Sequence, residues 1–254
     1  MNDPVEPGPL SRGFLDYFDW VYAKWDDEWD RFGDRPSFAG LRVLDFGSGH
    51  GSFAVRAAQE GASVVGLDVN DDVVLEATQH CRERFADLDL SFTSCPVDAL
   101  EDTFDVIITH ETFEHVLDLP ACLVTLNRRL MPGGRLYASW GPLWSSPLGG
   151  HELTAHFGQV PVPYSHLAQG PALRHYRARH PASDARSIAD VGLNGLSYRD
   201  YRRIVAESPF EVLRWQANAG GHPLYRALRL AARVTPRLAT ANVYAILRRP
   251  PAPV

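Results

Sequence analysis

Short apolar runs alternate with amphipathic stretches over the first 140 residues of the chain. Each apolar run has the length and character of a buried strand, and the runs cover residues 42–47, 63–69, 90–95, 104–110 and 135–140. Helix-like stretches lie between several of them, namely GSFAVRAAQE, DDVVLEATQHCRERFA and LPACLVTLNRRL. Because strands that alternate with helices usually pair in parallel, the pattern predicts an α/β fold with a mostly parallel sheet covered on both faces.

The pattern changes on either side of this core. Residues 10–30 carry aromatic side chains at helical spacing among acids, which predicts an amphipathic helix over a pocket or a sheet end. Residues 141–196 are rich in Gly, Pro and His and too long for a bare loop, so we expect a lid. A helix, SYRDYRRIVAES, and two strands, FEVLRWQAN and NVYAILRR, should then complete the same sheet. The predicted organisation is one domain with a helical cap (1–36), a cofactor-binding core (37–140), a lid insertion (141–207) and closing strands (208–254).

Composition narrows the classes of function. The net charge of −6 argues against a protein that is held to nucleic acid by phosphate contacts. The three cysteines have neither the number nor the spacing of a disulfide framework or a zinc knuckle. No apolar run approaches the ~18 residues of a membrane span, and no signal-peptide pattern is visible. We therefore expect a cytoplasmic protein that acts on a small molecule without a membrane partner, and the oligomeric state stays open.

Charge is spread unevenly along the chain. Residues 208–254 hold seven arginines and one acid, Glu211. Such a basic segment can touch membranes or acidic partners, but a solvated surface is the commoner role.

A glycine-rich loop stands between the first predicted strand and the following helix. The stretch VLDFGSGHGSFAVRAA (43–58) places Asp45 and three glycines at this crossing. Glycines let the backbone turn tightly and approach a ligand closely, and the helix amino terminus offers free N–H groups. Asp68 ends the second strand, where its carboxylate can accept hydrogen bonds from both hydroxyls of a ribose. The first crossing of an open parallel sheet is where ligands bind, so the loop predicts a nucleoside cofactor.

Two cofactors compete for such a loop, a nicotinamide dinucleotide and S-adenosylmethionine. The dinucleotide fingerprint needs Gly or Ala at the position that Ser52 occupies here, counting from Gly47. The sequence instead reads D-x-G-x-G-x-G, which resembles motif I of the class I S-adenosylmethionine-dependent methyltransferases. The resemblance extends through GLDVN, FDVIIT and LMPGGRLYAS over residues 40–140, and NVYAILRR resembles the closing strand of that superfamily. It implies a Rossmann-like, doubly wound, seven-stranded sheet, mostly parallel with an antiparallel last strand, plus the N-terminal cap and the lid.

The resemblance also implies which residues bind the cofactor. The glycine loop would line the methionine and ribose, Asp45 would face the methionine end, and Asp68 would hold the ribose hydroxyls. Many members of the superfamily have an Asp just past the third strand that accepts a hydrogen bond from the adenine amino group. In this sequence that position falls near Pro96, so the backbone of Val97 or the Asp98 carboxylate would make the contact instead. The predicted cofactor-binding residues are Asp45, Gly47, Ser48, Gly49, Gly51, Asp68, Val69, Val97, Asp98 and His110.

The stretch DVIITHETFEHV (105–116) carries three ionisable side chains just past the fourth predicted strand. Glu111, Glu114 and His115 stand at i, i+3 and i+4, which would place them on one face of a helix. The E-x-x-E-H pattern resembles that of ubiquinone-biosynthesis O-methyltransferases and small-RNA 2′-O-methyltransferases, in which the triplet binds a divalent metal. Mg²⁺ or another divalent ion would therefore be a second cofactor. The alternative is that the triplet only braces the loop and begins a helix.

The resemblance to the small-RNA enzymes implies a further histidine at the metal. No motif identifies it, but His151 follows a Gly149-Gly150 pair that can turn the lid inward, and His166 is the second choice. The candidate catalytic residues are His110, His115 and His151; the candidate metal ligands are Glu111, Glu114, His115 and His151. His151 could equally cap a lid helix that begins near Glu152.

The predicted function is methyl transfer from S-adenosylmethionine to a small molecule, foremost to a hydroxyl oxygen. Metal-independent N- or C-methylation and an NAD-dependent oxidoreductase are the alternatives.

Overall fold

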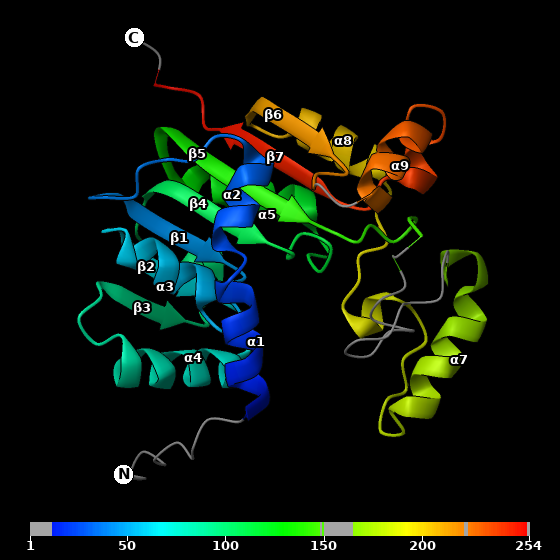
Figure 1. The fold of residues 1–254 in the computed structure, drawn as a ribbon, viewed down its shortest axis with the longest axis horizontal. Helices are drawn as coiled ribbons and strands as arrows, with labels where there is room; N and C mark the ends of the chain where they lie inside the picture. The colour runs from blue at the N-terminus through cyan, green and yellow to red at the C-terminus, as the bar shows by residue number, and fades with distance from the viewer. Residues whose placement is uncertain (1–11, 148, 150–164, 221–222, 253–254) are drawn as a thin grey trace. The chain divides into compact units, whose positions relative to one another are not determined.

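The computed structural model describes residues 12–147, 149, 165–220 and 223–252 (Figure 1). Seven strands form one sheet in the order β3-β2-β1-β4-β5-β7-β6. The strands are β1 Arg42–Phe46, β2 Ser63–Leu67, β3 Leu90–Thr93, β4 Phe104–His110, β5 Leu130–Trp140, β6 Glu211–Ala217 and β7 Val243–Arg248. β1 pairs in parallel with β2 and β4, β2 pairs in parallel with β3, and β6 pairs antiparallel with β7. This topology confirms the predicted Rossmann-like class with its antiparallel closing strand.

Helices and short 3-10 turns connect the strands. They are α1 Arg12–Tyr22, α2 Trp25–Phe32, α3 Ser52–Gln59, α4 Asp71–Arg84, η1 Val97–Ala99, α5 Leu119–Arg129, η2 Ser165–Ala168, α7 Gln169–Arg179, η3 Ala189–Val191, α8 Tyr198–Glu207, α9 Pro223–Ala232 and α10 Pro236–Ala239. No helix in the described ranges combines the length and the apolar character needed to cross a membrane.

The chain divides into two compact units, whose described parts are 12–110 with 128–137 and 251–252, and 111–127 with 138–147, 149, 165–220 and 223–250. The predicted division into cap, core, lid and closing strands stays a prediction.

In the first unit, the N-terminal helices are anchored by aromatic packing. Trp25 of α2 is fully buried and lies edge-on to Phe53 of α3 at 5.2 Å between ring centroids. Phe14 and Phe18 of α1 form a buried cluster with Val55 of α3. Since burying a large aromatic side chain contributes about 1.5–3 kcal/mol, these contacts hold both helices on α3, the helix that follows the glycine loop.

The predicted single helix over residues 10–30 is two helices, so that prediction was wrong in detail. α1 ends at Tyr22 and α2 begins at Trp25. Three consecutive acids, Asp26, Asp27 and Glu28, fill the first turn of α2. Acids stabilise a helix amino terminus through the helix dipole, so they favour a new helix at this point over continuation of α1.

In the second unit, Trp140 at the end of β5 is the centre of an aromatic cluster. Its ring lies 5.6 Å from Phe113, 5.3 Å from Tyr201 and 5.4 Å from Trp215. Trp140 and Tyr201 are each about 1% exposed. The cluster therefore ties the loop after β4 to α8 and β6.

Candidate active site

The glycine loop adopts a conformation that side chains would oppose. Gly47, Gly49 and Gly51 have φ angles of 75°, 49° and 86°, all in the left-handed region. The N–H groups of Gly47 and Ser48 both donate to the carbonyl of Leu67, at 2.8 and 2.9 Å, which ties the loop to the end of β2. A Cβ built on Gly49 would meet no atom within 4 Å, whereas one on Gly51 would lie 2.5 Å from Phe92. The loop therefore keeps an open side at Gly49 and a closed side against β3.

Asp68, which follows β2 directly, is hydrogen-bonded to the glycine loop. One of its carboxylate oxygens accepts from the Gly49 N–H at 2.9 Å, and the other accepts from the Asn70 N–H at 3.0 Å. A carboxylate has about four lone-pair positions, so two further hydrogen bonds can be accepted. Asp68 thus combines two roles, holding the loop in shape and offering acceptors to a pair of vicinal hydroxyls. The open side at Gly49, the amino terminus of α3 and this carboxylate fit the ribose of the predicted cofactor.

Asp45 is buried beneath the loop at 3% exposure. Burial raises the pKa of its carboxyl to about 7, the N–H of Ala54 opposes this shift, and Asp68 adds to it. One oxygen, Oδ2, has no hydrogen-bond partner in the described residues. A buried carboxylate with an unsatisfied oxygen favours the protonated form, so Asp45 makes folding depend on pH.

Asp45→Asn removes that dependence. A carboxyl whose pKa is raised on folding binds its proton more tightly in the folded state. Its stabilising contribution is full below the ordinary pKa of 3.8 and is lost as the pH rises toward about 7. The wild type should therefore lose up to about 4 kcal/mol relative to Asp45→Asn across this window. Urea unfolding of both proteins at pH 5 and pH 8 covers the upper part of this window, in which about 3 kcal/mol of the difference should appear; equal pH dependence would show that Asp45 is ionised over this range.

The remaining residues predicted to bind the cofactor differ in their surroundings. Ser48 has a buried hydroxyl without a hydrogen-bond partner among the described residues. Val69 is 89% exposed directly after Asp68. Val97 is half-buried and begins η1, and Asp98 is exposed, its carbonyl accepting from Arg129 at 2.7 Å. The contact to the adenine amino group from the Asp98 carboxylate or the Val97 backbone stays a prediction.

His110, the last residue of β4, is held by two residues that the sequence did not single out. Its ring stacks on Phe53 of α3, with centroids 4.8 Å apart and planes inclined by 26°. Glu28 of α2 lies with its carboxylate 3.7 Å from Nδ1 of His110. Glu28 is only 2% exposed and also accepts from Arg31 at 2.6 Å. At 3.7 Å the Glu28 carboxylate is beyond hydrogen-bond length, so it would attract the ring only when the imidazole is protonated, while stacking on Phe53 limits how the ring can turn.

His50 of the glycine loop links α1 to the cofactor region. Its ring centroid lies 4.6 Å from that of Phe14 and 4.8 Å from that of Tyr17. Burial is the main cause that lowers the pKa of His50, and Glu76 and Asp68 oppose it. A neutral imidazole packs well between aromatic rings, so His50 holds α1 against the loop.

Beyond His110, the predicted helix that would have carried the triplet is not formed. Residues 113–115 form a turn, and α5 begins only at Leu119. Asp118 explains the difference, because its side chain accepts from the Ala121 N–H at 3.1 Å and caps the helix there, with Pro120 in the first turn. The prediction of a shared helical face was therefore wrong.

Each residue of the triplet has a separate environment. Glu114 is 3% exposed, and its Oε1 accepts from the Gly141 N–H at 2.9 Å. His115 is exposed, with Nδ1 2.8 Å from the carbonyl of Gly192. Glu111 is exposed and has a positive φ of 49°. A positive φ in a residue other than glycine is uncommon and marks a constrained turn.

Asn194 clamps the turn that carries Glu114. Its side-chain amide donates to the carbonyls of Phe113 and Val116, at 2.7 and 3.0 Å, and its own N–H donates to the carbonyl of Glu114 at 2.9 Å. Burial and the Glu114 carboxylate both raise the pKa of the Tyr201 hydroxyl. Glu114 therefore serves as a buried brace in a hydrogen-bonded network.

The predicted metal set lies only partly within the described residues. Among the described residues, no group of three or more His, Cys, Asp or Glu side chains is arranged to hold a metal ion. Glu111, Glu114 and His115 are all described, and by themselves they do not make such a group, so no chemical step is assigned to a metal. His151 lies outside the described residues, and its predicted place in the metal set stays a prediction.

His166, the second choice, lies beside Trp144 with ring centroids 6.4 Å apart. Its pKa is lowered by burial and by Arg237.

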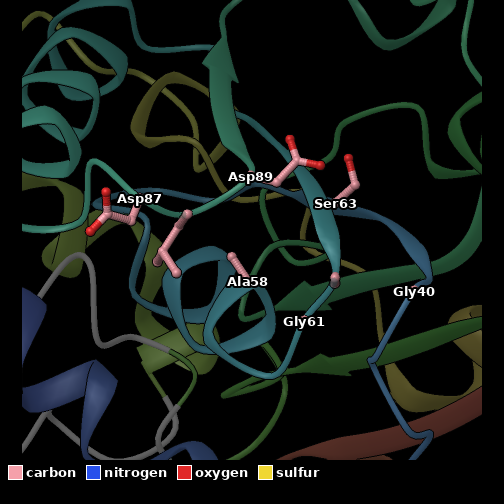
Figure 2. A pocket seen from close by; sticks show the side chains of 8 residues that line it. Gly40, Ala58, Gly61, Ser63, Asp87 and Asp89 are labelled. Atoms are coloured by element: carbon pink, nitrogen blue, oxygen red, sulfur yellow. The ribbon is translucent and has the colours of Figure 1, made fainter.

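A separate hollow of about 330 Å³ lies at the opposite end of the strands (Figure 2). Gly40, Ser63 and Asp89 on its wall stand at or just before the first residues of β1, β2 and β3. Ligands of open parallel sheets bind outside the carboxyl ends of the strands. The hollow is therefore not the cofactor site.

Known proteins match the chain in part of its sequence and over most of its fold. A family described as a methyltransferase domain matches residues 37–143. A ubiquinone biosynthesis O-methyltransferase from Rhizobium rhizogenes is 34% identical over 119 residues, which cover 45% of this chain and 48% of the relative. The chain spans about half the length of the curated relatives that it matches most strongly.

Solved structures share the fold over nearly the whole chain. An S-adenosylmethionine-dependent methyltransferase from Mesorhizobium loti has a TM-score of 0.58 at 19% identity, covering 91% of this chain and 100% of that protein. Geranyl diphosphate C-methyltransferase from Streptomyces coelicolor has a TM-score of 0.59 at 17% identity, and the match covers 97% of this chain and 86% of that protein. It was solved with Mg²⁺, geranyl diphosphate and S-adenosylhomocysteine. At these identities the likeness concerns the fold alone.

Proposed function

Since the chain belongs to the class I S-adenosylmethionine-dependent methyltransferases, we propose that it transfers the methyl group of S-adenosylmethionine to a hydroxyl oxygen of a small molecule. The observation that carries the proposal is the D-x-G-x-G-x-G loop with all three glycines in left-handed backbone and Asp68 closed onto Gly49. Curated relatives that match about 45% of the chain are named as O-methyltransferases, which supports an oxygen acceptor over nitrogen or carbon.

The bound cofactor would supply an electrophilic methyl group on a sulfonium centre. Residues of the chain would orient it: Asp68 would accept from the ribose hydroxyls, the amino terminus of α3 would face the polar methionine end, and Asp45 would lie beneath the loop. Displacement at a sulfonium carbon depends on alignment, so positioning would supply much of the rate. Ser52 occupies the place where a dinucleotide loop has Gly or Ala, which disfavours the NAD-dependent alternative.

A hydroxyl acceptor must lose a proton, and histidine suits that task near neutral pH. We propose His110 as the first candidate base, because Glu28 and Phe53 hold its ring. His151 and His115 are the other candidates. Turnover of the three alanine variants ranks them, with melting temperature as the control for folding.

Chelation separates the two roles that the triplet can take. The hydrogen bonds of Glu114 and the clamp by Asn194 support a bracing role. We therefore expect that methyl transfer from labelled S-adenosylmethionine to a panel of phenols is unchanged in EDTA. The assay follows the methyl ether by mass spectrometry, with aliphatic alcohols and amines as comparison acceptors. Activity that EDTA abolishes and Mg²⁺, Mn²⁺ or Zn²⁺ restores would assign Glu111, Glu114 and His115 to a metal, with His151 as their fourth partner.

A further inference from the structure

The α9 helix presents an apolar face to solvent, which is unusual for a surface helix. Leu224 is 41% exposed, Leu230 65% and Val234, just past the helix, 84%. Ala227 and Ala231 are exposed between them. These five residues are called the apolar stripe: Leu224, Ala227, Leu230 and Ala231 recur at spacings that share one side of the helix, and Val234 follows in the turn.

Another side of α9 packs against the rest of the second unit and holds the helix in place. Leu228 is buried and clusters with Ala239 of α10 and Ala241, and Tyr225 and Ala232 pack against them. This inner side already serves the hydrophobic core of the second unit. The apolar stripe is a second, separate face, and the described part of the chain leaves it in water.

Arginines flank the apolar stripe along a third side of the helix. Arg226, Arg229 and Arg233 are all exposed and spaced by three and four residues. Arg229 donates to the carbonyls of Asn218 and Gly220, which are neutral acceptors. The sequence contains no Asp or Glu after Glu211, and no ion pair to these three arginines occurs among the described residues. Within the described ranges, their positive charge is therefore available to an anionic partner.

An apolar stripe bordered by arginines is the arrangement of a helix that lies in the interface of an anionic lipid bilayer. The stripe would enter the boundary between headgroups and acyl chains, and the arginines would meet the phosphates. A nucleic acid would satisfy the arginines but leave the stripe in water. A second copy of the chain, docked through this face about a two-fold axis, would bring like charges together.

We propose that α9 is a peripheral membrane-binding element that docks the protein on anionic lipid surfaces. The proposal departs from the sequence-based expectation of no membrane partner. The proposed element binds at the surface of the bilayer and does not cross it. It does not depend on the proposed methyl transfer, because vesicle binding is measured without cofactor or substrate.

Vesicle co-sedimentation of the full chain tests the proposal. The protein should pellet with vesicles of equimolar phosphatidylcholine and phosphatidylglycerol, and not with phosphatidylcholine alone. About 0.5 M sodium chloride should release most of it, because the Debye length then falls to roughly 4 Å. Replacing the three arginines by glutamine should weaken partitioning by about a hundredfold.

Two further variants separate the apolar contribution from charge. Leu230→Ser with Val234→Ser keeps every arginine and should also abolish pelleting. A matched control, Leu75→Ser with Arg82→Gln, removes an exposed leucine and an exposed arginine from α4 and should pellet like the wild type. Absence of pelleting by the wild type, equal loss in the control, or a concentration-dependent dimer that the serine variant abolishes would overturn the proposal.

Discussion

Asp68→Ala is expected to weaken S-adenosylhomocysteine binding by ~1–3 kcal/mol, the scale of lost hydrogen bonds to a charged group. Two effects add at this residue. The variant removes the acceptors proposed for the ribose hydroxyls, and it also removes the partner of the Gly49 N–H, so the loop loses its shape before any ligand arrives. The thermal shift that the ligand produces in the wild type should therefore nearly vanish.

Asp87→Ala is the matched control for this change. Asp87 is an exposed aspartate of the same unit and lines the hollow at the other end of the strands (Figure 2). It should leave the ligand-induced shift unchanged. An Asp68→Ala protein that keeps the full shift would place the cofactor elsewhere.

Glu114→Ala should destabilise the protein by about 2–4 kcal/mol, with no metal added. The variant leaves the buried Gly141 N–H without its acceptor and opens a cavity beside the aromatic cluster around Trp140. Glu114→Gln keeps an oxygen at this position and should lose less. Denaturant unfolding in EDTA measures the free energy of unfolding of the wild type, Glu114→Ala and Glu114→Gln.

Glu111→Ala provides the comparison within the same turn. Glu111 is exposed, so its loss should change the free energy of unfolding by no more than about 0.5 kcal/mol. If Glu114→Ala were as stable as Glu111→Ala in EDTA, the bracing role would be wrong.

Local sequence signals predicted the sheet and the glycine loop well. Gly47, Gly49, Gly51 and Asp68 lie within a short stretch, and their chemistry requires one backbone geometry. The structure has that geometry, with the loop hydrogen-bonded to the end of β2. The strands were equally predictable, because buried parallel strands leave continuous apolar runs.

Long-range contacts were not predictable in the same way. Glu28 stands among Asp26, Asp27 and Asp30, and nothing in that acidic stretch marks it as the residue that is buried beside His110. The role of Asn194 depends on a contact to residues about 80 positions earlier.

The error at the triplet had a signal that sequence reasoning missed. Asp118 followed by Pro120 is a helix start, and it favours a helix that begins at Leu119 over one that begins at Glu111. Spacing of i, i+3 and i+4 has meaning only inside a helix.

Calorimetric titration of the full chain with S-adenosylhomocysteine and, separately, with NAD⁺ tests the central claim most directly. A methyltransferase should give a saturable heat for S-adenosylhomocysteine at one site per chain, which Asp68→Ala strongly weakens, and no binding of NAD⁺. Saturable binding of NAD⁺ with no response to S-adenosylhomocysteine would contradict it.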